Sequence, residues 1–234
     1  SLYPSMMHSE SGNYYPVGMP TFWIGDYIPD IAKDGRHYYF VRIKTEFELK
    51  PGKLPCIQIK HDLSYPSTEW LTTSDIKSRV DGLYHKTRIS LSTGELRRTW
   101  VILTLTMTDF ELIQEQYNLI NCEILDGCFF DAEIGLFDSY IDKYKKIKME
   151  SKGARREIAK LFLNNLYGKM ATNTNSSFKY AQLNEDGSIA YMDVPQFDKK
   201  PGYIPIGSAI TSYARNFTIR AAQANYHGLT KPGF

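Results

Sequence analysis

Apolar and polar positions alternate through the first part of the chain, as they do along half-buried β-strands. In YYFVRIKTEFEL, residues 38–49, one side of a predicted strand carries Tyr39, Val41, Ile43, Phe47 and Leu49. A Pro-Gly pair at 51–52 then predicts a turn, and CIQIK predicts the strand that returns beside the first. The pattern indicates an antiparallel hairpin.

A second hairpin and a short helix are predicted next. Residues 87–106, TRISLSTGELRRTWVILTLT, predict two strands joined by a Thr-Gly turn at 93–94. Thr108 and Glu111 then have the spacing of a capping box, and apolar residues as far as Tyr117 indicate a short helix. CEILDGCFF, directly after this helix, predicts one more strand.

From residue 136 the apolar residues recur at the period of an α-helix. One helix is predicted through Ile147, and Gly153 interrupts the pattern. A second helix is predicted from about Arg155 to Tyr167, with Gly168 where it could stop. Two helices separated by a short break predict an antiparallel helical hairpin.

Two further elements complete the pattern. Residues 178–194, FKYAQLNEDGSIAYMDV, predict a β-hairpin with an Asp-Gly turn at 186–187. Residues 207–228, GSAITSYARNFTIRAAQANYHG, predict a last helix, on which Thr211 and Arg215 share the polar face. Its predicted packed face comprises Ile210, Tyr213, Phe217, Ala221 and Ala224.

Composition and charge narrow the classes of partner. With 234 residues, 42% of them apolar, the chain can bury a core as one large domain or two small ones. Its formal charge of +2 is near neutral, so a polyanion has to be bound by a local basic patch. Between residues 143 and 169 there are nine Lys or Arg against two Glu, which places that patch on the predicted helical hairpin.

The cysteines and the hydropathy of the sequence indicate in which compartment the protein would be found. Cys56, Cys122 and Cys128 match no zinc or redox spacing, which favours a reduced, intracellular and cytoplasmic protein. No apolar run is long enough to span a membrane, so no membrane partner is predicted. The first residue is not Met, and we expect the chain to be a piece of a longer protein.

The segment KLFLNNLYGK, residues 160–169, carries polar residues that could form a ligand-binding site. On a helix Arg156, Lys160, Asn164 and Tyr167 fall within about a quarter turn of one another. Cations four residues apart repel mildly unless an anion binds between them, and a phosphate chain is such an anion. The stripe predicts either a phosphorylated ligand, whose sugar or base meets Asn164 and Tyr167, or a basic face exposed to water.

Three segments together resemble motifs of the family B DNA polymerases. KLFLNNLYG is similar to K-x3-N-S-x-Y-G of their fingers, SLYP to the end of D-x-x-S-L-Y-P in their palm, and TSYAR to T-x-x-A/G-R. The order of the motifs, the β-rich insertion between the first two and the β-hairpin after the fingers resemble the protein-primed branch, found in certain bacteriophages and linear plasmids. The likeness covers essentially the whole chain and implies a phage- or plasmid-encoded polymerase.

The resemblance implies that the basic helices bind an incoming dNTP. Lys148, Arg156 and Lys160 would hold its triphosphate. Asn164 and Tyr167 would line the nascent base pair.

The resemblance also implies roles for both ends of the chain. Leu2 and Tyr3 would offer backbone amides to the triphosphate, and the Tyr3 ring would lie under the sugar, where a 2′-hydroxyl would clash. Thr211 and Arg215 would contact the backbone of primer-template DNA. Asn165 stands where the family has Ser, a departure that concerns the packing of the helix more than nucleotide contact.

The fold class implied by the resemblance is α+β with an incomplete palm sheet. Residues 1–9 would be a palm segment, 10–135 a β-rich insertion that meets the terminal protein and DNA, and 136–172 the helical hairpin of the fingers. Residues 173–203 would be a β-hairpin insertion that helps to enclose DNA during strand displacement, and 204–234 a palm helix segment.

Catalysis in the family needs carboxylates that this sequence does not contain. Phosphoryl transfer uses two Mg²⁺ ions, which the family binds with the Asp of D-x-x-S-L-Y-P and with Y-x-D-T-D, and no D-T-D occurs here. We therefore expect no catalytic residue and no metal ligand in this chain, and an inactive isolated chain. Its partners would be dNTP, primer-template DNA and a terminal protein primer. The alternatives are a non-catalytic module that binds nucleic acid or terminal protein, and a piece that folds only in part.

Overall fold

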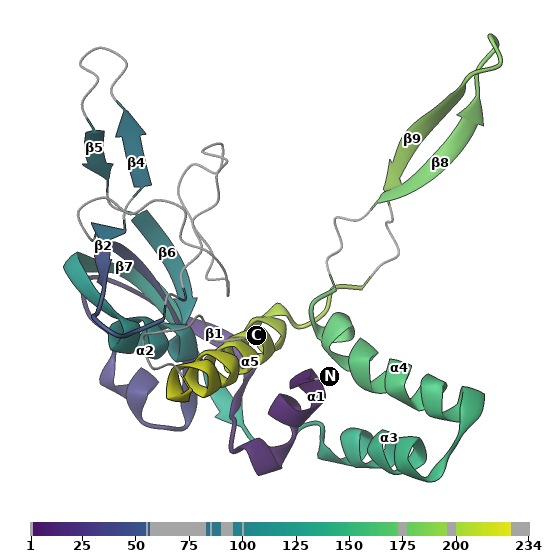
Figure 1. Ribbon diagram of the computed structural model, residues 1–234, viewed down its shortest axis with the longest axis horizontal. Helices are drawn as coiled ribbons and strands as arrows, with labels where there is room; N and C mark the ends of the chain where they lie inside the picture. Colours follow the sequence, from purple (N-terminus) through teal and green to yellow (C-terminus); the bar gives the residue numbers. More distant parts are fainter. Residues whose placement is uncertain are drawn as a thin grey trace.

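A curved antiparallel sheet lies on one side of the protein and a pair of antiparallel helices on the other, with two further helices between them (Figure 1). The structure is a computed structural model that describes residues 2–54, 56, 83–84, 86–89, 96–99, 101–172, 177–195 and 200–225. This arrangement confirms a mixed α+β fold. Along the described ranges, no helix is both long and apolar enough to cross a membrane.

The sheet is organised around its long strand β2. The strands are β1 (Tyr15–Ile24), β2 (His37–Leu49), β3 (Leu83–Tyr84), β6 (Val101–Thr106) and β7 (Tyr117–Glu133). Their order is β1-β7-β2-β3, and β6 also pairs with β2. All of these pairings are antiparallel. The strands predicted in 38–49 and at CEILDGCFF are thus confirmed, whereas the returning strand predicted at CIQIK lies outside the described residues except for Cys56.

Alternation along β2 is largely as predicted. Val41, Ile43 and Phe47 are buried in the core between the sheet and the helix that follows β6. Tyr38, which the pattern assigned to the opposite side, is nevertheless fully buried, because a second core covers that face of the strand.

The short helix α2 (Met107–Gln116) is displaced from its prediction at both ends. Its N-cap is Thr106, whose hydroxyl accepts from the amide of Asp109 at 3.1 Å. Thr108, the predicted cap, is buried, and its hydroxyl lies 3.0 Å from that of Tyr38. Tyr117, predicted within the helix, has extended backbone angles and begins β7.

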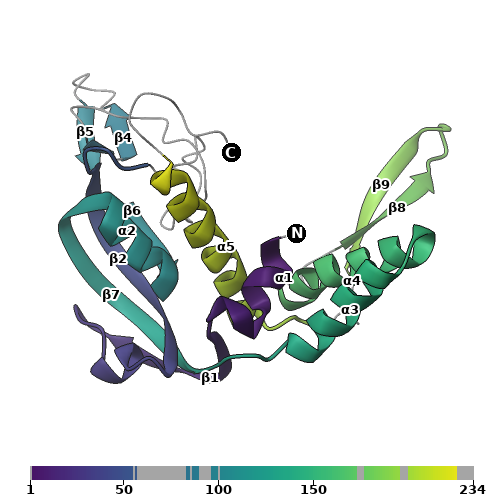
Figure 2. The ribbon, with the colours of Figure 1, turned by 60° about the horizontal axis from the view of Figure 1, so that its bottom comes forward.

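The two β-hairpins predicted later in the chain are both present, the first in part and the second in full. Strands β4 (Lys86–Ile89) and β5 (Leu96–Thr99) pair with each other, and the turn between them lies outside the described residues. Strands β8 (Ser177–Leu183) and β9 (Ile189–Pro195) form the hairpin with the Asp-Gly turn, in which Gly187 has φ +80°. This hairpin extends away from the rest of the protein (Figures 1 and 2).

The predicted helical hairpin is confirmed as α3 (Asp138–Glu150) and α4 (Gly153–Met170). Gly153, at φ +59°, begins α4 after the break. The predicted stop at Gly168 is wrong, because the helix continues to Met170, which packs against the second core. The hydroxyl of Thr172 then donates to the carbonyl of Gly168 at 2.9 Å and helps to close the helix end.

The last helix, α5 (Ile204–Ala224), is confirmed, and of its predicted packed face Ile210 is buried and Tyr213 packs against the second core. The C-terminal half of that predicted face is wrong. Phe217 is 54% exposed, and Ala221 and Ala224 are also exposed. Ser212 is buried instead, together with apolar residues on the same side of the helix. The helix turns this side inward because α2 supplies a buried carboxylate, Asp109, that pairs with it.

A second core joins four helices, α1 (Leu2–Met7), α3, α4 and α5. It contains Met7 of α1, Ile141 of α3, Leu163 of α4 and Ile210 of α5. Figure 2 shows α1 between α5 and α4, and α1 contacts both helices. Burial of one apolar side chain from each helix fixes the helical hairpin against the short helix at the start of the chain.

Candidate functional site

A pocket opens between α1 and the α3–α4 hairpin. Its cavity volume is about 300 Å³, within the range of small-ligand sites. It is lined by Pro4, Ser5, His8, Glu10, Ile141, Lys145, Lys148, Met149, Lys160, Leu163 and Asn164. The structure therefore brings together Lys148 and Lys160, which the sequence predicted as phosphate ligands, with Asn164 beside them.

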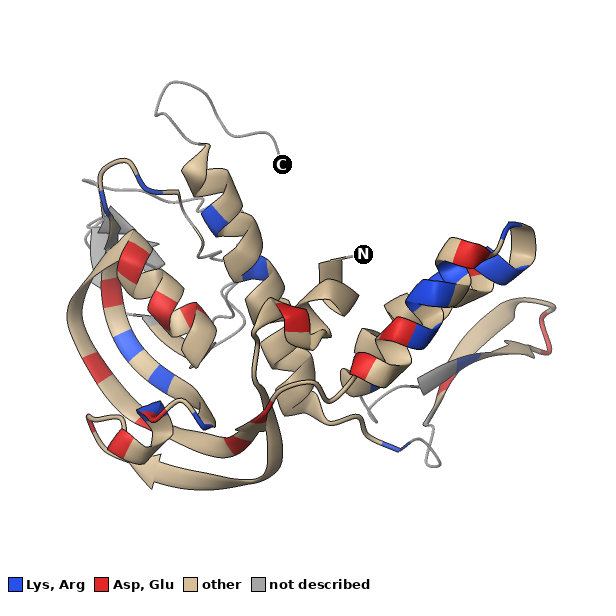
Figure 3. Ribbon diagram, turned by 90° about the horizontal axis from the view of Figure 1, so that it is seen from below, with Lys and Arg blue, Asp and Glu red and all other residues tan. Residues whose placement is uncertain are grey.

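The pocket is electropositive. Three lysines from two helices line it, and among the described residues that line it Glu10 is the one carboxylate. Figure 3 shows that Lys and Arg gather on the α3–α4 hairpin. The Lys160 ammonium lies 3.5 Å from the carboxylate of Glu157, but both side chains are more than half exposed. Such a surface pair contributes about 1 kcal/mol or less, so an anionic ligand can replace it.

Two tyrosine rings meet beside the pocket. The ring of Tyr3 in α1 lies 4.6 Å from the ring of Tyr167 in α4, at an interplanar angle of 45°. Burial raises the pKa of the Tyr167 phenol above its ordinary value of 10, Tyr3 raises it further, and Arg215 lowers it. The phenol is therefore neutral at pH 7, and it can both donate and accept a hydrogen bond.

The other predicted nucleotide-binding residues lie around this centre. Leu2 is half-buried in α1 and does not line the pocket. Arg156 is exposed on α4, one turn before Lys160, and is not part of the lining either. Asn165 is exposed rather than packed, so its difference from the family Ser leaves the core unchanged.

The two predicted DNA-binding residues make contacts within the protein. Arg215 donates from Nε and Nη2 to the two carboxylate oxygens of Asp109, at 3.1 and 2.9 Å. Ser212 donates to the same carboxylate at 2.8 Å, and the Asp109 side chain is only 4% exposed. Thr211 donates to the carbonyl of Ser208 at 2.9 Å. Contact of Thr211 and Arg215 with DNA stays a prediction.

Sequence reasoning missed four residues of this region. Lys145, His8 and Glu10 line the pocket, and Asp109 holds Arg215. Lys145 stands one turn before Lys148, so helical spacing could have placed both on one face. Asp109 directly precedes Phe110 and lies one helical turn before Leu112 and Ile113. Its place on this apolar side is also a usable signal, because a buried carboxylate needs a partner.

The described residues do not fit a catalytic metal pair. No group of three or more His, Cys, Asp or Glu side chains that could hold a metal ion occurs within them. Asp109 has both of its oxygens engaged by Arg215 and Ser212. No step through a metal ion can be derived from this part of the chain.

Comparison with known proteins identifies the relatives of the chain. The sequence model of the family described as DNA polymerase type B, organellar and viral, matches residues 1–232. The DNA polymerase of Bacillus phage Nf is 39% identical over 227 residues, which cover 97% of this chain and 35% of that protein. The DNA polymerase of Streptococcus phage Cp-1 is 33% identical, over 97% of this chain and 36% of that protein.

Solved structures show the same relationship. Phi29 DNA polymerase complexed with primer-template DNA and incoming nucleotide substrates is 37% identical, with a TM-score of 0.72 over 96% of this chain and 35% of that chain. Phi29 DNA polymerase complexed with primer-template DNA alone gives a TM-score of 0.71 at 34% identity. The chain spans about one third of the length of these relatives.

Proposed function

This chain belongs to the organellar and viral type B DNA polymerases, and we propose that it forms the part of such an enzyme that binds the incoming dNTP and the primer-template. The observation that carries the proposal is the pocket between α1 and the α3–α4 hairpin. It combines three lysines, an amide and a neighbouring tyrosine pair, which are the groups that phosphates, a sugar and a base require.

In this proposal the triphosphate occupies the lysine side of the pocket. Lys148 and Lys160 approach it from α3 and α4, and Lys145 adds a third charge. Arg156 extends the basic path outward from Lys160 along the exposed face of α4. The amides of Leu2 and Tyr3 belong to the first turn of α1, where backbone N–H groups lack intrahelical partners and can bind an anion.

The sugar and the base lie toward the tyrosine pair. Asn164 lines the pocket one turn after Lys160, and Tyr167 follows it on the same side of α4. Because the Tyr3 ring packs against Tyr167, the sugar would rest on Tyr3 beside the nascent base pair. A 2′-hydroxyl would then meet the Tyr3 ring, which favours deoxynucleotides.

The remaining parts are proposed to handle DNA and the primer. Residues 1–9 and 204–234 form palm segments, residues 136–172 the fingers, and residues 10–135 the insertion that meets a terminal protein primer and DNA. The β8–β9 hairpin, within residues 173–203, would help to enclose DNA during strand displacement. The order of the motifs and the phage relatives support a protein-primed enzyme.

Catalysis is proposed to depend on Mg²⁺ held by carboxylates other than those described. The isolated chain of 234 residues is therefore expected not to extend a primer when it is supplied with Mg²⁺ and dNTPs.

The test is steady-state kinetics of a full-length polymerase that carries this segment. Lys148→Ala and Lys160→Ala each remove a charge-assisted phosphate contact, so the KM for every dNTP should rise roughly ten- to a hundredfold. Lys146→Ala is the matched control, because Lys146 lies on α3 between two lining lysines, is exposed, and does not line the pocket. If KM and kcat are unchanged in both pocket variants, the lysines of these helices form a basic face exposed to water and do not bind the nucleotide.

A further inference from the structure

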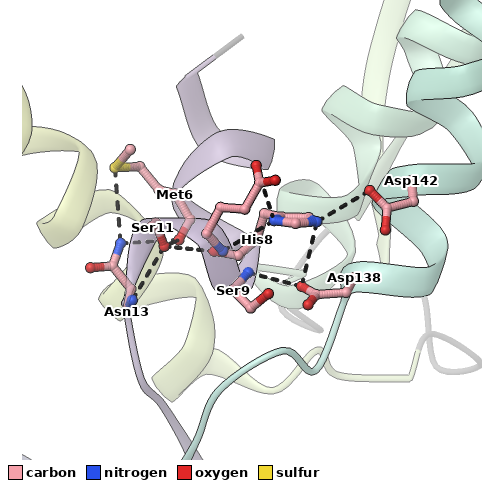
Figure 4. A network of polar contacts seen from close by, with 8 residues as sticks. Met6, His8, Ser9, Ser11, Asn13, Asp138 and Asp142 are labelled. Carbon is pink, nitrogen blue, oxygen red and sulfur yellow. Dashed lines mark hydrogen bonds and ion pairs between the residues drawn. The ribbon is translucent and has the colours of Figure 1, made fainter.

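His8, one of the residues that line the pocket, links the turn after α1 to the start of α3. Its Nε2 lies 3.1 Å from Oδ1 of Asp142 and 4.0 Å from Oδ1 of Asp138. The amide of the next residue, Ser9, donates to Asp138 at 2.9 Å. Figure 4 shows the imidazole pointing from the turn toward both aspartates, which stand one helical turn apart on α3.

The hydrogen bonds around the imidazole define its role. The amide of Glu10 donates to Nδ1 at 3.2 Å, so that nitrogen presents its lone pair and the proton is on Nε2. The Nε2–H group then donates to the Asp142 carboxylate, which makes a charge-assisted hydrogen bond. The His8 side chain is only 12% exposed, whereas Asp142 is 63% exposed, so the imidazole is the fixed partner.

The turn that carries His8 is itself held firmly. The carbonyl of Met6 accepts from Ser11 Oγ at 2.9 Å, Asn13 Nδ2 at 3.0 Å and the Tyr15 hydroxyl at 2.6 Å. Tyr15 is fully buried in the second core. The imidazole therefore extends from a rigid base toward a helix that also carries two of the pocket lysines.

We propose that His8 is a positioning residue for nucleotide binding, an inference that rests on the function proposed above. Through Asp142 it fixes α3 against α1, and so it sets the separation between the pocket wall that holds the sugar and the wall that holds the phosphates. Pro4, directly after Tyr3 in α1, lies on the first wall, and Lys148 lies on the second. Without this contact the two walls move relative to each other, and ligand binding has to order them.

The same chain offers a matched control. His37 lies between Asp34, at 2.8 Å, and Asp131, at 3.3 Å, and is 14% exposed. This cluster also places an imidazole between two aspartates, but it joins β2 to β7 and to the turn before β2, and it does not line the candidate pocket. Loss of His37 therefore reports the cost of losing such a cluster without any effect on the separation of the pocket walls.

The experiment measures KM and kcat for the four dNTPs in the full-length polymerase that carries this segment, with Lys160→Ala as a reference for the pocket. His8→Ala should raise KM for all four by about threefold to tenfold and change kcat less than about twofold. Asp142→Ala should do the same, and the double variant should be no worse than either single variant. His8→Gln keeps an N–H donor near the position of Nε2 and should restore KM. His37→Ala should leave KM unchanged.

Each alternative outcome is distinct. If Lys160→Ala raises KM but His8→Ala and Asp142→Ala do not, the positioning role is wrong and the proposed function stands. If none of the three changes KM, both are wrong. A rise in KM for His8→Ala that Asp142→Ala does not share, or that His8→Gln does not restore, means that His8 contacts the nucleotide itself, which overturns the positioning role. Asp142 is exposed, so Asp142→Ala and His8→Gln decide the matter even where His8→Ala fails to fold.

Discussion

At the scale of single residues, the structure separates side chains that one helical pattern treats alike. Lys145 and Lys148 line the pocket, whereas Lys146, between them in the sequence, is exposed away from it. On α4, Lys160 and Asn164 face the pocket, and Arg156 from the same predicted stripe does not line it. Helical spacing predicted which residues share a side of α4. It could not predict where along that side α1 approaches, because that contact joins residues far apart in the sequence.

Tyr3 gives a prediction at this scale. In the full-length polymerase, Tyr3→Val removes the ring that packs against Tyr167 and that we propose lies under the sugar, so ribonucleotides should be admitted. The ratio of kcat/KM for dNTP over NTP should fall by roughly tenfold or more. Tyr3→Phe keeps the ring and should keep the selectivity. Equal selectivity in Tyr3→Val and the wild type, measured by single-nucleotide incorporation, would show that the ring does not exclude the 2′-hydroxyl.

At the scale of elements, local patterns predicted which helices and strands exist better than they predicted which way the elements face. The alternation in β2 and the Asp-Gly turn of the β8–β9 hairpin are local signals, and both were confirmed. The predicted packed face of α5 holds for Ile210 and Tyr213 but is wrong at Phe217, which is exposed, whereas the helix buries Ser212 toward Asp109. Asp109, the partner that draws Ser212 inward, stands 103 residues away in the sequence, beyond the reach of any pattern in α5 itself.

The contact between α2 and α5 gives a prediction at this scale. Asp109 and Arg215 form a bidentate pair whose side chains are 4% and 14% exposed. Asp109→Ala leaves a buried guanidinium and the Ser212 hydroxyl without their acceptor, so the free energy of unfolding should fall by about 3–5 kcal/mol. Urea denaturation of the isolated chain measures this change. Replacement of both partners, Asp109→Leu with Arg215→Met, should recover much of the loss, because no charge then stays buried.

A second ion pair between the same two helices is the control. Glu115 and Arg220 are also bidentate, but their side chains are 40% and 44% exposed. Glu115→Ala should therefore cost about 1 kcal/mol or less. If the two pairs cost the same, burial is not what makes the Asp109 pair important, and the inward orientation of α5 needs another explanation.

At the scale of the whole molecule, a nearly neutral chain concentrates its positive charge on one pair of helices. The formal net charge is +2, yet Lys and Arg gather on the α3–α4 hairpin (Figure 3). Acidic residues are spread over the molecule, and several of those on the sheet and α2 pair with Lys, Arg or His. A polyanion therefore meets a local attraction rather than a field that surrounds the protein.

This distribution predicts how the isolated chain binds DNA. Binding of DNA through the α3–α4 hairpin should be weak, independent of the DNA sequence and dependent on salt, because the lysines contact phosphates rather than bases. If three or four phosphates are neutralised, a fourfold rise in salt should weaken binding by roughly 40- to 150-fold. Fluorescence anisotropy of a labelled duplex at two salt concentrations measures this change. The double variant Lys145→Glu with Lys146→Glu should bind DNA more weakly than the unaltered chain at each salt concentration. Lys33→Ala removes a lysine that pairs with Asp30 far from the α3–α4 hairpin, and this variant should bind DNA as the unaltered chain does. Binding that ignores salt, or that prefers one sequence, would mean that the chain recognises bases and that the basic helices do not follow the phosphate backbone.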